Sequence, residues 1–454
     1  MSAKDLTLLS LAELSGQLRR RTISPVTLTE AYLERIDALD GRLHAFNHVM
    51  AEDAMAGATA AEREIALGAW RGPLHGIPIG IKDMIDVADV PTTAQAVHRR
   101  DHVAERDADV VASLRRAGAI IIGKQAMTEY AVGGTQLDHA WPPARNPWNL
   151  DLDALSSSSG GCVSVASGLC AASVGTETAG SIRDPAAWNG VAGLNPTVGL
   201  VSTIGVLPLS ATMDCVGPIA WTVEDCGLLL SGMADFTPPE FDGDIRGMRI
   251  GVVRDWYEDD PDVDPAVLKT MASSLLLLEE LGASLCTIEL GDFDEYGRIA
   301  RAVAWPEEYA AHREELEQYP DRLTAVSRSR LEDGGAYSAA DYIAARKQRL
   351  AAIEHYKQIM RDFDVVILPT MKQPALPAGF EFTDLGNVEL SYSRPFNLLG
   401  CPALSLCAGF TESGLPVGIQ FAGRHFEEGT VLRAGHALEQ ALGLRGRRPA
   451  IALS

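Results

Sequence analysis

Three short segments carry the residues whose types and spacing could perform chemistry: IKDMIDV with Lys82, SSSSGG with Ser157, and TETAGSIRDP with Ser181. Lys82 follows the apolar run GPLHGIPIGI and is one of only seven lysines in the chain. Loss of hydration in such a setting lowers the pKa of a lysine, so that the neutral amine can act as a base. Bringing that pKa from about 10.4 to near 7–8 costs roughly 3–5 kcal/mol, which a fold tolerates mainly where function needs it. A structural ion pair is the commoner role for a single lysine after a strand.

The tetrapeptide Thr178-Ala179-Gly180-Ser181 is small and flexible, so its chain can turn until several backbone N–H groups converge on one point. Such a cluster of donors stabilises the oxyanion of an acyl-transfer intermediate, and each donor contributes on the order of 10²–10³ in rate. A plain turn before a helix is the alternative for the tetrapeptide taken alone.

Other motifs in the chain do not support a competing chemistry. GAIIIGKQ (118–125) resembles a phosphate-binding loop, but its isoleucines belong in a buried strand and Gln125 stands where Ser or Thr would bind magnesium. His98 and His102 are spaced as on a helix, yet they lie in the charged stretch VHRRDHVAERD, which is typical of a solvated surface. HExxH, GxSxG and SxxK motifs are missing from the sequence.

The composition is that of a globular protein with a full core. The chain has 454 residues, of which 46% are hydrophobic and 22% charged, and its net charge is −22. An acidic surface disfavours nucleic acid and anionic membranes as partners. The seven cysteines lack CxxC spacing, so we expect reduced thiols, no metal, and a cytoplasmic location. We find neither a secretory signal nor a run of about 18 apolar residues.

The pattern of elements indicates one large α/β domain over residues 1–454. We expect a helical part over 1–70, a core over 70–230, a variable and lid-like helical region over 240–350, and a return to the core over 360–454. Ser24-Pro25 predicts the start of a helix, and the alternation of Ile77, Ile79 and Ile81 predicts a strand that carries Lys82 at its end. Further strands are predicted at 119–122, 365–369, 403–410 and 417–423, and a last helix over 429–442.

The order of these segments resembles the amidase signature family, whose core pattern is G-G-S-S-[GS]-G and then G-T-[DE]-T-G-G-S-[IV]-R-x-P-A. Aligned without gaps, Ser157 takes the first serine position and lies 24 residues before Ser181. The segments GIPIGIKDMIDV, RNPWN, GVAGLNPTVGLVS, FNLLGCPALSLCAGF and GLPVGIQFAGR also match relatives. The resemblance covers residues 70–230 and 360–440, and it implies a large mixed, twisted β-sheet covered by helices on both faces.

The resemblance also implies a serine–serine–lysine triad and no cofactor. In the family's mechanism Ser181 attacks an amide carbonyl, Ser157 in a cis peptide relays the proton, and neutral Lys82 is the base. This agrees with the general need of a hydroxyl nucleophile for an adjacent base. The implied oxyanion donors are the backbone amides of Thr178, Ala179, Gly180 and Ser181. Arg183 and Asp214 match positions that support the site structurally.

Departures from the family pattern bear on the substrate, because none removes a catalytic group. They are Leu155 and Ser156 at the usual glycine pair, Ala179 at the first glycine of the turn, Asn195 at a common lysine, and Asp184, a carboxylate three residues past Ser181. Alanine fits position 179 only with a negative φ. Ser158 is an adjacent rival for the relay, although the ungapped spacing favours Ser157.

We therefore expect a hydrolase of small aliphatic or aryl amides or of acyl hydrazides. Met127, Tyr130 and Trp305 are candidate substrate-binding residues, with core packing as the alternative role of the aromatic ones. The A subunit of a tRNA-dependent glutamine amidotransferase is the second interpretation, and the tail SRPFNLLGCPALSL argues against it because it resembles the stand-alone amidases. A binding scaffold without activity is the third. A homodimer is common among relatives and compatible with the sequence.

Overall fold

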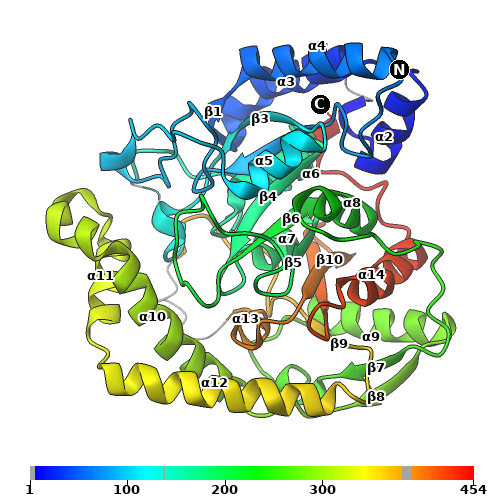
Figure 1. Ribbon diagram of the computed structural model, residues 1–454. Helices are drawn as coiled ribbons and strands as arrows, with labels where there is room; N and C mark the ends of the chain where they lie inside the picture. Colours follow the sequence, from blue (N-terminus) through cyan, green and yellow to red (C-terminus); the bar gives the residue numbers. More distant parts are fainter. Residues whose placement is uncertain (1–5, 136, 138, 381–389, 454) are drawn as a thin grey trace.

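The computed structural model describes residues 6–135, 137, 139–380 and 390–453. In this part of the chain, eleven strands form one mixed sheet in the order β1-β3-β2-β4-β6-β5-β10-β11-β9-β7-β8 (Figure 1). The strands are β1 (Phe46–Val49), β2 (Pro78–Lys82), β3 (Ile120–Gln125), β4 (Ala172–Glu177), β5 (Ala192–Asn195), β6 (Cys215–Ala220), β7 (Arg249–Val252), β8 (Ser284–Thr287), β9 (Val365–Pro369), β10 (Ala403–Phe410) and β11 (Pro416–Gly423). The predicted α/β class is confirmed.

Helices cover both faces of the sheet. On one face, Gly435 of the C-terminal helix (Glu428–Leu442) lies against Leu404 of β10. On the opposite face, Ala187 of the helix Arg183–Asn189 lies against Gly418 of β11. The helices are α2 (Leu11–Arg19), α3 (Pro25–Leu43), α4 (Ala51–Ala66), α5 (Asp109–Arg116), α6 (Ser159–Ser167), α7 (Arg183–Asn189), α8 (Val223–Met233), α9 (Pro265–Glu280), α10 (Phe293–Gln318), α11 (Ala325–Gly335), α12 (Ala339–Ile359), α13 (Arg394–Leu399) and α14 (Glu428–Leu442). No described helix is long and apolar enough to cross a membrane.

Local sequence signals explain most of these boundaries. The Ser24 side chain accepts a hydrogen bond from the Thr27 N–H, and Pro25 occupies the first turn of α3, as predicted. The isoleucine run of GAIIIGKQ forms the fully buried strand β3, which lies parallel to β2. Strands β9, β10 and β11 also form where the sequence predicts them.

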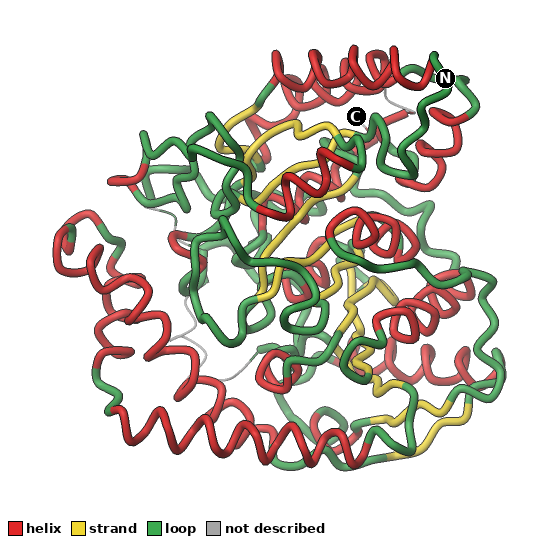
Figure 2. Tube along the Cα trace, in the orientation of Figure 1, coloured by secondary structure: helices red, strands yellow, loops and turns green. Residues whose placement is uncertain are grey.

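Two regions contain strands that periodicity did not indicate. The part expected to be helical over 1–70 also contributes β1, which pairs with β3 at one edge of the sheet. The region over 240–350 contributes β7, which pairs in parallel with β9, and β8, which pairs in parallel with β7 and forms the other edge. Each of these strands has four residues, too few to show a period in the sequence. Helices α10, α11 and α12 form an outer layer, drawn at the left and bottom of Figure 1 and in red in Figure 2.

Candidate active site

Lys82 lies at the carboxyl end of β2, a strand between β3 and β4 whose five residues are all buried. Its side chain is 2% exposed. The Nζ atom donates hydrogen bonds to Ser157 Oγ (2.7 Å), Thr176 Oγ1 (2.8 Å) and the Thr176 carbonyl (3.3 Å). Burial lowers the pKa of Lys82 to about 7, although the negative charge of Asp214 opposes the shift. A substantial fraction of Lys82 is therefore neutral near pH 7.

The two adjacent serines have different partners. The Ser156–Ser157 peptide bond is cis, and the Ser157 hydroxyl contacts Lys82 as described above. Ser158 Oγ instead donates to the carbonyl of Thr176 (3.1 Å). Both side chains are 1% exposed. Of the two serines, it is thus Ser157 whose hydroxyl lies within hydrogen-bond reach of the lysine.

Leu155, at a position where the family pattern has glycine, adopts a left-handed backbone conformation with φ of 60°. Such a conformation is unfavourable for a leucine, so surrounding contacts must hold it. The side chain packs in a small apolar cluster with Trp188, Met371 and Leu390, and the Leu155 N–H donates to Asp153 Oδ1 (2.6 Å). Side-chain packing here replaces the conformational freedom of a glycine.

Residues 178–181 form the turn between β4 and α7, and this turn touches the serine loop directly. The Ser158 N–H donates to the carbonyl of Ser181 (3.1 Å). Gly180 has φ of 110°, and a Cβ placed on it would lie 2.0 Å from Asp184 Oδ2, so only glycine fits. Ala179 is not among the residues with positive φ, which meets the condition for alanine at this position. Ser181 and Ala179 are partly exposed.

A buried ion pair fixes the chain on both sides of this turn. The Glu177 carboxylate accepts hydrogen bonds from the backbone N–H groups of Ile182 (2.8 Å) and Arg183 (2.9 Å), and from the Arg183 guanidinium. Arg183 also donates to Gln420 Oε1 (2.6 Å) and Asn397 Oδ1 (2.7 Å). Neither member of the pair has exposed side-chain surface. A buried pair of this kind is stable only when its remaining donors and acceptors are satisfied, as these are.

Asp214 holds the first residue of the turn. Its carboxylate accepts from Thr178 Oγ1 (2.5 Å) and from the backbone N–H groups of Leu209 (2.8 Å) and Ser210 (2.9 Å). Burial raises the pKa of Asp214 to about 6. Arg183 and Asp214 therefore lie beside the turn rather than within it.

Two departures from the family pattern lie in this same buried shell. Asp184 accepts a hydrogen bond from Ser391 Oγ (2.7 Å), and burial, followed by the charge of Glu177, raises its pKa to about 7. Asn195 accepts from Asn397 Nδ2 (3.4 Å), which places it in contact with the Arg183 network. Both residues belong to the packing behind the turn.

The three candidate substrate-binding residues have unequal surroundings. Met127 is buried beside a small pocket that Ser159 also lines, and its N–H donates to Gln95 Oε1 (2.5 Å). Tyr130 is fully buried, and its hydroxyl lies 2.6 Å from His98 Nε2. His98 is thus in contact with an aromatic side chain rather than fully solvated, contrary to the sequence expectation.

Trp305 packs within the outer helical layer. The guanidinium of Arg330 lies 3.8 Å from the centre of the Trp305 ring, and Tyr337 meets the ring edge-on at 6.2 Å. These contacts fit the packing alternative for this tryptophan.

Several residues that hold the site together were not among the candidates predicted from the sequence. Thr176, Glu177 and Gln420 lie inside segments that matched the family, so their positions carried a signal, but their partners are distant in the sequence. Asn397 also lies inside a matching segment, FNLLGCPALSLCAGF. Glu307 had no such signal, because a hydrogen bond across about 100 residues cannot be read from spacing.

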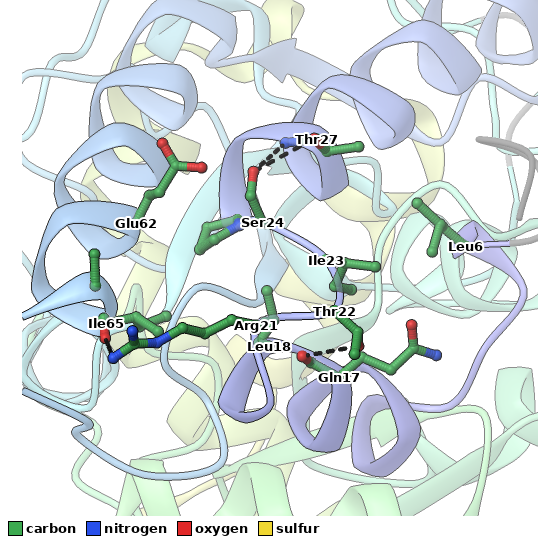
Figure 3. Close-up of a pocket in the computed structure, with 12 residues that line it drawn as sticks. Leu6, Gln17, Leu18, Arg21, Thr22, Ile23, Ser24, Thr27, Glu62 and Ile65 are labelled. Atoms are coloured by element: carbon green, nitrogen blue, oxygen red, sulfur yellow. Dashed lines mark hydrogen bonds between the residues drawn. The ribbon is translucent and has the colours of Figure 1, made fainter. Parts of the chain in front are cut away.

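A separate cavity of about 650 Å³ lies between α2, α3 and α4, and Figure 3 shows its lining. Its polar groups largely bind each other: Arg21 donates to the Ile65 carbonyl (2.7 Å), and Thr22 donates to the Gln17 carbonyl (3.2 Å). None of Lys82, Ser157 or Ser181 lines it.

The family model described as Amidase matches residues 27–432. The chain belongs to the amidase signature family. It is 34% identical to the A subunit of the glutamyl-tRNA(Gln) amidotransferase of Geobacter metallireducens, over 95% of this chain and 97% of that protein. It is 35% identical to the putative amidase AmiD of Mycobacterium tuberculosis, over 98% of this chain and 96% of that protein.

Solved structures agree with this assignment. A crystal structure of an amidase superimposes with a TM-score of 0.87 at 33% identity, covering 95% of this chain and 99% of that one. The predicted fold, a mixed sheet of the amidase-signature type, is confirmed. In general terms, the chain is an amide hydrolase of this family.

Proposed function

We propose that this chain is a stand-alone hydrolase of aliphatic or aryl carboxamides or of acyl hydrazides. The observation that carries the proposal is the pairing of a fully buried lysine with a serine hydroxyl at 2.7 Å, beside a turn that presents a second, partly exposed serine. A base with a pKa of about 7 suits proton transfer at neutral pH.

In the proposed mechanism, Ser181 Oγ forms the bond to the substrate carbonyl carbon. Its proton passes to Ser157 Oγ as the Ser157 proton passes to Lys82 Nζ. The backbone amides of residues 178–181 donate to the oxyanion. Collapse of the tetrahedral intermediate breaks the C–N bond, and the proton returns through Ser157 to the leaving nitrogen. Water then repeats the sequence on the acyl-enzyme and releases the acid.

Similarity to two kinds of relative supports two candidate functions. The likeness to AmiD and to the solved amidase supports the stand-alone enzyme. The equally close likeness to the amidotransferase chain supports hydrolysis of glutamine within a larger assembly as the second candidate. We favour the first, since it requires no partner chain and the C-terminal segment resembles the stand-alone amidases.

A single-turnover assay on the purified chain tests the proposal. The panel contains an aliphatic amide, an aryl amide, an acyl hydrazide and glutamine, and intact mass spectrometry looks for an acyl adduct on Ser181. Turnover of an amide or hydrazide that Ser181→Ala abolishes would support the stand-alone hydrolase. Hydrolysis of glutamine alone would favour the amidotransferase function, and the lack of both turnover and adduct with every substrate would contradict both.

A further inference from the structure

Glu307 and Glu308 are adjacent carboxylates of α10 that face different neighbours. Glu308 is paired with Arg330 of α11 at 2.8 Å, within the outer helical layer. Glu307 is 9% exposed and faces the loop that leads into β6. This loop, residues 209–214, contains Asp214, which holds the turn of the candidate active site.

The Glu307 carboxylate binds this loop at three donors. It accepts from Ser210 Oγ (2.6 Å), from the Thr212 N–H (3.0 Å) and from Thr212 Oγ1 (2.8 Å). From α12, Tyr342 Oη donates to it at 2.7 Å, and the Arg346 guanidinium lies 3.6 Å away. A single buried carboxylate thus joins both long outer helices to the loop.

The opposite side of the same loop binds the turn. Asp214 accepts from the Ser210 N–H, while the Ser210 hydroxyl donates to Glu307. Asp214 in turn accepts from Thr178 Oγ1 at 2.5 Å. Hydrogen bonds through Ser210 and Asp214 therefore connect Glu307 of α10 continuously with the first residue of the turn. Arg349 of α12 donates to Thr212 Oγ1 at 2.9 Å, the same hydroxyl that donates to Glu307.

We propose that Glu307 is a positioning residue for the reaction, which holds the oxyanion-binding turn in place through Ser210, Asp214 and Thr178. The inference rests on the proposed function of residues 178–181. Donors to a developing oxyanion must be held within about 0.5 Å of their productive position, and buried hydrogen-bonded neighbours supply that rigidity. The outer helical layer thereby contributes to transition-state stabilisation without touching the substrate.

If the hydrogen bonds of Glu307 only stabilised the fold, their loss would lower the stability of the protein and leave the chemistry of each folded molecule unchanged. A positioning role predicts a different result. Loss of positioning weakens the interaction made only in the transition state, so kcat falls and KM changes little. A thioamide reports this directly, because its sulfur is a poor hydrogen-bond acceptor and gains less from the turn than an oxygen does.

The experiment compares Glu307→Gln and Glu307→Ala with the matched control Glu308→Gln. Each protein is assayed on the amide that wild type turns over best and on the corresponding thioamide. We expect kcat to fall roughly 10-fold for Glu307→Gln and ~10²-fold for Glu307→Ala, with less than about a 3-fold change in KM. The amide-to-thioamide ratio should fall at least about 5-fold in Glu307→Ala and stay at the wild-type value in Glu308→Gln.

Thermal unfolding of each variant separates folding from positioning. If Glu307→Ala is too unstable to assay, Glu307→Gln carries the test. An unchanged thioamide ratio in a folded Glu307 variant would overturn the proposal. An equal fall in Glu308→Gln would also overturn it, because the effect would then belong to the layer as a whole.

A double-mutant cycle tests the path itself. Thr178→Val removes the far end of the path, so the double variant Glu307→Ala/Thr178→Val should be about as slow as the slower single variant. Additive losses would overturn the proposed route.

Failure of the proposed function would be visible separately, with a fluorophosphonate probe on wild type. In that reaction Ser181 Oγ bonds to phosphorus, fluoride leaves, and the hydroxyl proton passes to Lys82; lack of Ser181 labelling would refute the mechanism, and with it the role of Glu307.

Discussion

The sheet that carries the candidate triad and the outer helices that flank it are held by different means. Every residue of β2, β4 and α6 is buried, and most of these residues are small or aliphatic. By contrast, α12 has 21 residues but buries only Ala345, Arg349 and Tyr356. The inner region is fixed by backbone pairing and close packing, while α12 is attached largely by side-chain hydrogen bonds, such as that of Arg349 to Thr212 and that of Tyr342 to Glu307.

This difference determines what each region can contribute. Around the triad, the backbone of Gly80 lies against the Gln125 side chain and that of Gly180 against the Asp184 side chain, so neither glycine can be replaced by a larger residue. An attachment made by side chains tolerates changes in the surrounding sequence, provided that the few anchoring residues remain. We therefore expect substitutions in the inner region to remove chemistry or folding, and substitutions in the outer layer to modulate them.

The largest effect is expected for Lys82→Met. Methionine fills a similar volume without a base, so acylation of Ser181 should fall ~10³-fold or more while the protein remains folded. Wild-type kcat/KM should rise with pH and level off above about pH 7, because Lys82 acts in its neutral form and burial lowers its pKa to about 7. A stopped-flow pH profile measures both.

Lys124 provides the matched control for this variant. It is equally buried, one strand away on β3, but its Nζ is paired with Asp83 Oδ1 at 3.1 Å. Lys124→Met should destabilise the fold by leaving Asp83 without its cationic partner, yet the pH profile of the folded fraction should keep its wild-type shape. Loss of the pH dependence in Lys124→Met would contradict the assignment of the base to Lys82.

The next largest effect is expected for Glu177→Gln, which leaves Arg183 without its charge partner in the interior. Breaking a buried pair by changing one member costs about 3–5 kcal/mol. On the outer layer, Glu308→Gln also breaks an ion pair, but its Arg330 partner is 30% exposed and can be solvated. Its cost should be about 1 kcal/mol or less. Urea unfolding of both variants compares the two regions directly, and equal losses would contradict the distinction drawn between them.

The sequence predicted the inner region better than the outer one for a physical reason. Ile79, Ile81 and Lys82 are neighbours along one strand, so periodicity and motif spacing are sufficient to place them. The pairing of Lys82 with Ser157 rather than Ser158 depends on local chain geometry that spacing could favour but not show. Glu307 lies in a region that matched no motif, and its role depends on contacts with residues about 100 positions away.

Three strands and the role of one tryptophan differ from the sequence prediction for a similar physical reason. Strands β1, β7 and β8 have four residues each and lie at or next to the edges of the sheet, where pairing with the neighbouring strand stabilises them more than their own sequence does. Trp305 was a reasonable wall residue by composition, yet its ring is stacked against Arg330 of the neighbouring helix. Tertiary contacts of this kind leave no trace in a single sequence.

A smaller effect, dependent on pH, is expected for Asp184→Asn. Burial raises the pKa of Asp184 to about 7 in the fold, so the native state binds more protons than the unfolded state between about pH 4 and pH 7. That group therefore lowers wild-type stability as pH rises through this window. Asparagine can still accept from Ser391 and cannot ionise.

The variant should consequently be more stable than wild type above pH 7, by on the order of 1–3 kcal/mol, and the difference should shrink toward pH 4. Differential scanning calorimetry of both proteins at a series of pH values measures this stability difference. A stability difference that does not vary with pH would show that Asp184 does not titrate in this range.

The smallest effect is expected on the outward face of α12, where Ile343 and Leu350 are 66% and 63% exposed. Replacing either by Gln removes no buried contact and keeps a residue of similar helix propensity, so stability should change by less than about 0.5 kcal/mol.

Arg349, next to Leu350 but buried, provides the contrast, because Arg349→Gln would remove its hydrogen bonds to Thr212 and to the Leu398 carbonyl. If the outer layer acts on the turn only through its anchoring side chains, Leu350→Gln should keep the wild-type kcat and Arg349→Gln should lower it. A loss of activity in Leu350→Gln would instead mean that the whole face of the helix contributes, and the contrast between packing in the core and anchoring in the layer would have to be abandoned.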